Sequence, residues 1–195
     1  MSATQRILCL HGYHGSGAIL QQQMRGLTAK LPDVSLTFVD AQSLARGDFG
    51  WWHDRFAGWE RTRDWALSQL RAGQFDGVFG FSQGAALAGL LAAVQETDGP
   101  VGLFRFAIMV GGFTSPFPEH ADLFRKPISI PSLHIIGRSD VVIPPRDSAA
   151  LAARFADPEI LQHPGGHVVP ASGDIPDRVA DFLRRNTAPV SETTR

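Results

Sequence analysis

Short β-rich runs alternate with longer amphipathic runs along almost the whole chain, and this alternation limits the possible folds more than any other feature. Several of the β-rich runs are apolar on both faces, as strands buried between two layers of helices are. The predicted strands cover residues 6–10, 34–39, 75–79, 104–110, 132–136 and 159–162. The predicted helices cover residues 17–31, 55–72, 82–95, 145–155 and 176–184. The pattern predicts an α/β fold with a mostly parallel sheet of about six strands and helices on both faces.

The length of the chain suits a single domain. It has 195 residues, 44% of them apolar, which is enough for one sizeable hydrophobic core. We see no internal repeat and no linker, so we expect one domain over residues 1–186 without a large cap domain. Residues 187–195 are polar and lack periodicity, which predicts a flexible C-terminal tail.

Charge and composition argue against several classes of partner. The formal net charge of −1 gives no electrostatic reason to expect nucleic acid. The apolar runs are too short to span a bilayer, so we expect no membrane insertion. The N-terminus lacks the length and cleavage site of a secretory signal, which favours the cytoplasm. Cys9 is the only cysteine and sits in an apolar run, so we interpret it as a core residue. The sequence leaves the oligomeric state open.

Residues 80–84, Gly-Phe-Ser-Gln-Gly, match the pattern G-x-S-x-G between a predicted strand and a predicted helix. A strand that turns directly into a helix holds its serine in a strained backbone, and only small flanking residues let the two elements approach. Gly80 and Gly84 meet that need. We therefore predict that Ser82 is a nucleophile at the tip of this turn, against the alternative of a glycine-rich turn with an incidental helix-capping serine.

A serine hydroxyl becomes a good nucleophile when a neighbouring base takes its proton. In hydrolases with this turn, an Asp or Glu and then a His follow the serine in the chain, each on a loop after a strand. Asp140 follows the predicted strand 132–136 through a short turn, and we predict that it orients the base. The rivals are Asp147, inside the next predicted helix, and Asp174, before the last one.

His167 is the predicted base. Both His163 and His167 lie after the last predicted strand, and Gly165 and Gly166 between them give freedom to aim the ring of His167. We expect activity to fall as His167 is protonated in acid. His163 lies nearer to the strand and is the alternative.

The glycine-bearing segment after the first predicted strand is the expected second half of an oxyanion hole, because its backbone can turn an N–H toward a developing negative charge. We assign the two donors to the backbone N–H groups of Tyr13 and Gln83. His11 and His14 are three residues apart on a predicted loop with no carboxylate close by, so we predict no metal site.

Two long irregular stretches, residues 41–54 and 111–131, are expected to leave the carboxyl ends of strands, where ligands bind in such sheets. They carry four aromatic residues that are candidates for lining a substrate pocket: Phe49, Trp51, Trp52 and Phe113. Packing of these rings onto the core is an equally open alternative.

Six segments resemble the fungal-type serine hydrolases that include the ovarian tumour-suppressor-like hydrolases. They are LCLHGY, the Trp pair at 51 and 52, FDGVFGFSQGAALAGLLAA, FRFAIMVGGF, PSLHIIGRSDVVIPP and HPGGHVVP, in this order along almost the whole chain. A more distant similarity links them to acyl-protein thioesterases and carboxylesterases. The resemblance implies a single-domain α/β-hydrolase fold with Ser82, Asp140 and His167 as catalytic triad. His14 departs from relatives, which often carry other polar residues at this place in the oxyanion loop.

The predicted reaction is hydrolysis of a carboxylic ester through an acyl-enzyme on Ser82, without a cofactor. The substrate would be a small acyl ester, with an open site suited to short or medium acyl groups. The first alternative is a thioesterase that releases acyl groups from CoA or a carrier protein. The second is a hydrolase scaffold that binds a ligand without catalysis, which the retained Ser, Asp and His argue against.

Overall fold

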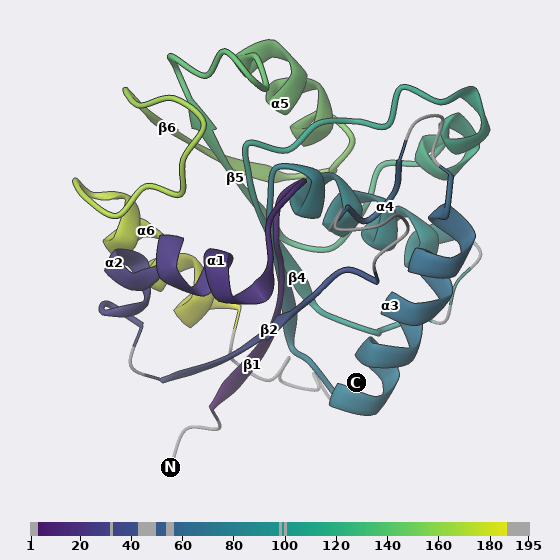
Figure 1. Cartoon of the computed structure of the whole chain (residues 1–195), viewed down its shortest axis with the longest axis horizontal. Coiled ribbons are helices and arrows are strands. Elements are labelled where there is room, and N and C mark those ends of the chain that lie inside the picture. The colour runs from purple at the N-terminus through teal and green to yellow at the C-terminus, as the bar shows by residue number, and fades with distance from the viewer. Residues whose placement is uncertain are drawn as a thin grey trace, which may run out of the picture.

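Six parallel strands form one sheet in the order β2-β1-β3-β4-β5-β6 in the computed structural model (Figure 1). The strands are β1 (Gln5–Leu10), β2 (Val34–Val39), β3 (Gly77–Phe81), β4 (Phe106–Val110), β5 (Ser132–Gly137) and β6 (Pro158–His163). The structure describes residues 4–31, 33–42, 50–53, 57–97, 99 and 101–186. The tail predicted from residue 187 lies outside this range.

Helices cover both faces of the sheet, as the apolar strands predicted (Figure 1). One face packs against α1 (Gly17–Gln23), α2 (Arg25–Thr28) and α6 (Ile175–Arg185). The other face packs against α3 (Trp59–Gly73), α4 (Gln83–Thr97) and α5 (Pro145–Ala152). Each layer has its own hydrophobic core, and the sheet separates the two. One helix was expected over residues 17–31, but the structure has two helices there, α1 and α2, which meet at Met24.

The third strand starts and ends two residues later than the sequence predicted. Asp76 is held by polar contacts instead of joining the strand: its carboxylate accepts the N–H of Arg6 at 2.8 Å and pairs with Arg105 at 2.6 Å. At the other end, Gly80 and Phe81 remain in the ladder with β4. The strand therefore continues to Phe81, directly before Ser82, where the turn was predicted.

The strand order creates an opening at the carboxyl ends of β1 and β3. The chain leaves β1 toward α1 on one face of the sheet, and it leaves β3 toward α4 on the other face. Because β1 and β3 are neighbours, the order of the strands reverses at this point, and ligands bind at the carboxyl ends of the strands at such a point in open α/β sheets. Within the described part of the chain, no helix has the length and apolar character needed to cross a bilayer.

The long segment between β4 and β5 is more ordered than expected. It contains a 3₁₀ helix, Pro118–Phe124, whose first residue is a proline. Proline suits that position, because the first N–H of a helix has no intrahelical partner to lose. This helix packs beside α4 and brings the preceding residues of the segment over the carboxyl end of the sheet.

Candidate active site

Ser82 lies at the tip of a sharp turn between β3 and α4. Its backbone is left-handed, with φ of +56°, a conformation that costs a non-glycine residue free energy. Hydrogen bonds hold the residue there: its N–H donates to the carbonyl of Val110 at 2.9 Å, and its carbonyl accepts the N–H groups of Ala85 and Ala86. The strained backbone is thus fixed by the neighbouring strand and by the first turn of the helix.

Two glycines make this turn sterically possible. A Cβ atom at Gly80 would lie 2.3 Å from the carbonyl oxygen of Gly84. A Cβ atom at Gly84 would lie 2.1 Å from the carbonyl oxygen of Leu10, at the end of β1. The G-x-S-x-G pattern therefore reflects the close approach of α4 to β3, as the sequence predicted, and to β1, which the sequence did not predict.

The structure brings Ser82, His167 and Asp140 into one hydrogen-bonded chain. The Nε2 atom of His167 lies 2.9 Å from the Oγ of Ser82, and its Nδ1 lies 2.7 Å from the Oδ2 of Asp140. The Asp140 side chain is 2% exposed and that of His167 is 17% exposed. With the Nδ1 proton directed to the carboxylate, Nε2 is left to accept the serine proton. The geometry is that of a serine activated by a histidine base.

The other oxygen of Asp140 is also occupied. Its Oδ1 accepts the backbone N–H groups of Val142 and Ile143, both at 2.9 Å. These bonds fix the carboxylate and, at the same time, the short turn that follows it. Asp140 therefore has a defined orientation before any substrate binds.

The rival residues lie elsewhere. Asp147 is in the first turn of α5, where it is half exposed and lies 3.6 Å from Arg146. Asp174 is the N-cap residue of α6. His163 ends β6 with its side chain buried, and burial lowers the pKa of its imidazole. Of the candidates that the sequence left open, the structure brings His167 and Asp140 together with Ser82.

The loop after β1 packs directly against the serine. A Cβ atom at Gly12 would lie 3.2 Å from the Cβ of Ser82. The buried ring of His11 braces this loop: its Nδ1 lies 2.7 Å from the carbonyl of Gly12, and its Nε2 accepts the N–H of Ala41 at 2.9 Å. Burial lowers the pKa of His11, and the neutral imidazole donates through Nδ1 while accepting through Nε2.

His11 therefore stabilises the backbone of this loop through its ring, and His14 contributes to the turn through its own backbone conformation. His14 adopts a left-handed φ of +54°, which reverses the chain after Tyr13. Among the residues that the structure describes, no three His, Cys, Asp or Glu side chains form a group that could hold a metal ion.

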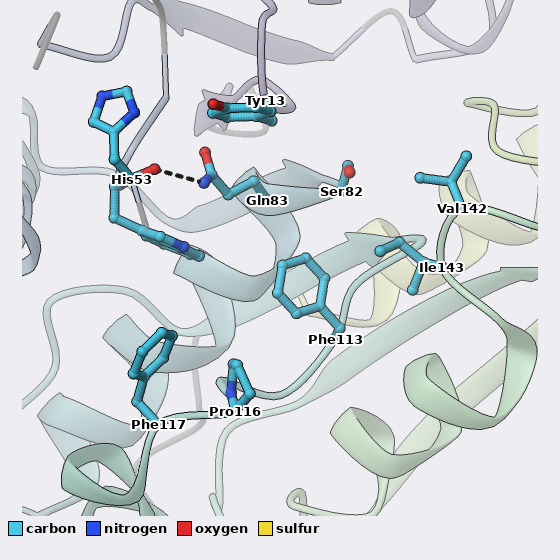
Figure 2. Close-up of a pocket in the computed structure, with 10 residues that line it drawn as sticks. Tyr13, His53, Ser82, Gln83, Phe113, Pro116, Phe117, Val142 and Ile143 are labelled. Carbon is cyan, nitrogen blue, oxygen red and sulfur yellow. Dashed lines mark hydrogen bonds between the residues drawn. The ribbon is translucent and has the colours of Figure 1, made fainter. Parts of the chain in front are cut away.

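A pocket of about 400 Å³ opens next to Ser82 (Figure 2). In this view Ser82 and Gln83 lie between the ring of Tyr13 and the ring of Phe113. Most of the pocket lining is apolar. The lining residues are Tyr13, Trp52, His53, Ser82, Gln83, Phe113, Pro116, Phe117, Val142 and Ile143.

The aromatic residues predicted for this pocket divide into three cases. Trp52 and Phe113 do line it. Trp51 is not among the lining residues: it is fully buried, and its indole Nε1 donates to the carbonyl of His11 at 2.7 Å. That expectation was wrong because the buried carbonyl draws the polar edge of the indole inward. Phe49 lies outside the described residues.

Sequence reasoning missed one side of the pocket. Pro116 and Phe117 line it, and a hydrogen-bonded cluster fixes their position: the Oγ of Ser115 accepts the N–H of Phe117 at 3.2 Å and lies 2.8 Å from the Nδ1 of His120. His120 is buried against the ring of Trp59. The sequence predicted that residues 111–131 lie at the ligand-binding end of the sheet, but no pattern singled out Pro116 and Phe117 within this stretch.

The known proteins that this chain resembles are described as serine hydrolases and esterases. A family model described as "Serine hydrolase (FSH1)" matches residues 1–179. The chain is similar to Esterase OVCA2 of Danio rerio, with 36% identity over 92% of this chain and 96% of that protein. It is also similar to Esterase OVCA2 of Xenopus tropicalis, with 36% identity over 85% of this chain and 86% of that protein.

A solved structure shows the same fold at lower sequence identity. Acyl-protein thioesterase 2 of Zea mays superposes with a TM-score of 0.72 over 96% of both chains, at 20% identity. The arrangement of one parallel sheet with helices on both faces is therefore that of the α/β-hydrolases. Because the family model spans most of the sequence and the relatives span nearly all of it, this chain belongs to the serine hydrolase (FSH1) family.

Proposed function

We propose that the protein hydrolyses carboxylic esters of small acyl groups through an acyl-enzyme on Ser82. The observation that carries the proposal is the hydrogen-bonded chain from Ser82 Oγ through His167 to Asp140, with distances of 2.9 and 2.7 Å. Family membership and the name esterase, borne by the relatives, support the same reaction. A scaffold that only bound a ligand would not need these two hydrogen bonds between Ser82, His167 and Asp140.

The reaction proceeds in two halves. His167 takes the proton of Ser82 as the oxygen attacks the acyl carbonyl carbon, and the imidazolium is stabilised by Asp140. The imidazolium then protonates the leaving alcohol, and the ester bond breaks. In the second half, His167 takes a proton from water as the water attacks the acyl carbonyl carbon. The bond from that carbon to the Oγ of Ser82 then breaks, the imidazolium returns its proton to Oγ, and the acid is released.

The negative charge of each tetrahedral intermediate needs hydrogen-bond donors. We propose the backbone N–H groups of Gln83 and Tyr13 for this role. Gln83 is the first residue of α4, whose initial N–H groups lack intrahelical partners. Tyr13 belongs to the loop that packs against Ser82, and both residues line the pocket beside the serine (Figure 2). The partial positive charge at the start of α4 also stabilises the negative charge of the intermediate.

The pocket volume of about 400 Å³ lies at the lower end of the ~300–1,000 Å³ typical of small-molecule sites. We propose that its apolar part holds the acyl chain and that the rings of Phe113 and Phe117 limit the length of that chain. Short or medium acyl groups are the expected substrates. A thioesterase is the second candidate, because acyl-enzyme chemistry serves both bonds and a solved protein of the same fold is an acyl-protein thioesterase.

The test uses p-nitrophenyl esters and CoA thioesters of matched acyl groups, from acetyl to palmitoyl, with wild type and Ser82→Ala. We expect kcat/KM to peak at a short or medium chain, to be higher for the oxygen esters, and to vanish in Ser82→Ala. A preference for thioesters would select the second candidate. Activity that survives in Ser82→Ala would contradict both.

A further inference from the structure

We propose that Trp51 is a positioning residue that holds the two donor-bearing segments of the oxyanion hole at a fixed separation. The inference rests on the proposed function, because it concerns how the donors on Gln83 and Tyr13 are kept in place. Trp51 is fully buried and lines no part of the pocket described above. All three of its polar groups nevertheless have partners within the protein, and two of these partners belong to the donor-bearing segments.

The first link runs to Gln83. The side-chain Oε1 of Gln83 accepts the backbone N–H of Trp51 at 2.9 Å. Its Nε2 donates to the carbonyl of Trp52 at 3.0 Å, which is the bond drawn as a dashed line in Figure 2. Gln83 is 7% exposed, so these bonds are shielded from water. Gln83, whose backbone N–H is one proposed donor, is thus hydrogen-bonded through its side chain to the backbone of Trp51.

The second link runs to the loop after β1. The indole Nε1 of Trp51 donates to the carbonyl of His11 at 2.7 Å, and the two rings pack with centroids 4.8 Å apart. His11 is joined through Gly12 to Tyr13, which carries the other proposed donor. The carbonyl of His11 also lies against the start of α4, only 2.6 Å from where a Cβ of Gly84 would be.

Trp51 is itself anchored from α3. The hydroxyl of Thr62 donates to its carbonyl at 2.5 Å, and the ring of Trp65 packs with its centroid 5.6 Å from that of Trp51. Trp51 therefore connects a rigid helix with the two segments that come from β1 and β3. The ladder between β1 and β3 ends at the pair Leu10 and Gly80, so strand pairing does not join the two segments beyond that point.

Donor placement is critical for this chemistry. An oxyanion donor acts at about 2.7–3.1 Å from the charge, and loss of one donor costs about 10²–10³ in kcat. A misplacement of about 1 Å from a distant change can cost about 10²-fold. A change at Trp51 should therefore lower the rate of the chemical step and leave binding of the ground-state ester nearly unchanged.

The experiment replaces Trp51 by Phe, which removes the indole N–H and keeps an aromatic ring. We expect kcat for a p-nitrophenyl ester to fall about tenfold or more, part of the full cost of a lost donor, while KM stays within about twofold. The inhibition constant of an alkyl trifluoromethyl ketone should rise by the same factor as kcat falls, because its adduct with Ser82 carries an oxyanion. Gln95→Met is the control, because it removes a buried side-chain hydrogen bond from Gln95 of α4 to the carbonyl of Phe104, and it should keep both values.

Gln83→Met supplies a second test, because it removes the other link and keeps the backbone N–H. We expect the same signature, and we expect the double variant with Trp51→Phe to be less impaired than the product of the single effects. Unchanged inhibitor affinity in both single variants, or an equal loss in Gln95→Met, would overturn the inference. Gln83→Met decides alone if Trp51→Phe does not fold. Failure of the proposed function would show separately, as activity retained in Ser82→Ala.

Discussion

The carboxylate of Asp140 contacts both the imidazole of His167 and the backbone of the turn that follows Asp140. One oxygen faces His167 at 2.7 Å, and the other accepts two backbone N–H groups from Val142 and Ile143. Both of the latter residues line the pocket. The same side chain thus orients the base and shapes one side of the substrate site, which makes it possible to separate the two roles by substitution.

We predict that Asp140→Asn lowers kcat by about 10³–10⁴, because an amide cannot stabilise the imidazolium and favours the wrong imidazole tautomer. The remaining carboxamide oxygen can still accept the N–H groups of Val142 and Ile143, so KM and the melting temperature should change little. Asp147→Asn is the control, since that carboxylate is half exposed on α5 and should leave the rates as they are. Steady-state kinetics on purified variants tests this, and a loss below tenfold would contradict the orienting role.

At the residue scale, the sequence was sufficient where a backbone rule fixes the position of a side chain. Ser82, Asp140 and His167 each follow a predicted strand, and the structure brings all three together. Trp51 follows no such rule, because a tryptophan in an irregular stretch can turn its ring either to a pocket or to the core. Its direction depends on the carbonyl of His11, which lies 40 residues away in the chain.

The approach of α4 to β1 is the contact between elements on which the site depends most. Gly84 lies where any Cβ would come within 2.1 Å of the carbonyl oxygen of Leu10, and both groups belong to backbone that cannot rotate away. The helix would have to move, and Ser82 would move with it. Gly102 offers a contrast, since no atom lies within 4 Å of a Cβ there and only its left-handed φ of +77° resists substitution.

We predict that Gly84→Ala lowers the free energy of unfolding by several kcal/mol, in the upper range for single substitutions, and abolishes activity. Gly102→Ala should cost only about 1–3 kcal/mol, from backbone strain alone, and should leave activity intact. Urea denaturation and ester hydrolysis measure the two effects. Equal costs at the two positions would show that the contact with β1 is not what excludes a side chain at Gly84.

The bounds of the elements were harder to predict than their existence. The third strand was predicted to end at residue 79. In the structure Gly80 still pairs beside Met109, while its lack of a side chain lets α4 approach, as the sequence predicted. The need for a small residue at Gly80 was thus visible in the sequence, but the continuation of the strand through it was not.

At the scale of the whole molecule, the alternation of strands and helices predicted the parallel sheet and its two helical layers. The strand order was not contained in that pattern, because the pairing of β1 with β3 joins segments about 70 residues apart. That pairing places the loop of Tyr13 next to the turn of Ser82. The site is therefore a property of the tertiary fold, although its separate parts are visible in the sequence.

The stability of the whole molecule should depend on pH through a histidine remote from the reaction. His134 on β5 is 2% exposed and packs against Phe155, and burial lowers its pKa to about 3 from the ordinary value of 6.5. Below pH 6.5 the imidazole of His134 binds a proton in the unfolded chain, whereas in the folded protein it stays neutral down to about pH 3. Its contribution to stability is thus complete above pH 6.5 and is lost as the pH falls.

We predict that this residue alone removes about 1.4 kcal/mol of unfolding free energy per pH unit over that range. His134→Leu, which cannot be protonated, should show a shallower decline between pH 7.5 and 4.5 than wild type. Urea denaturation at several pH values provides the comparison, and the values at pH 7.5 correct for any change in packing. Parallel declines in the two proteins would contradict this assignment.

The central claim is that Ser82 is a nucleophile made reactive by His167, and covalent labelling tests it most directly. Intact-protein mass spectrometry after treatment with a fluorophosphonate, followed by peptide mapping, should show one adduct per chain on Ser82 of the wild type. The adduct should be absent from Ser82→Ala and should form much more slowly in His167→Ala, where the general base is lost. An adduct on another residue, or equal labelling rates in wild type and His167→Ala, would contradict the account.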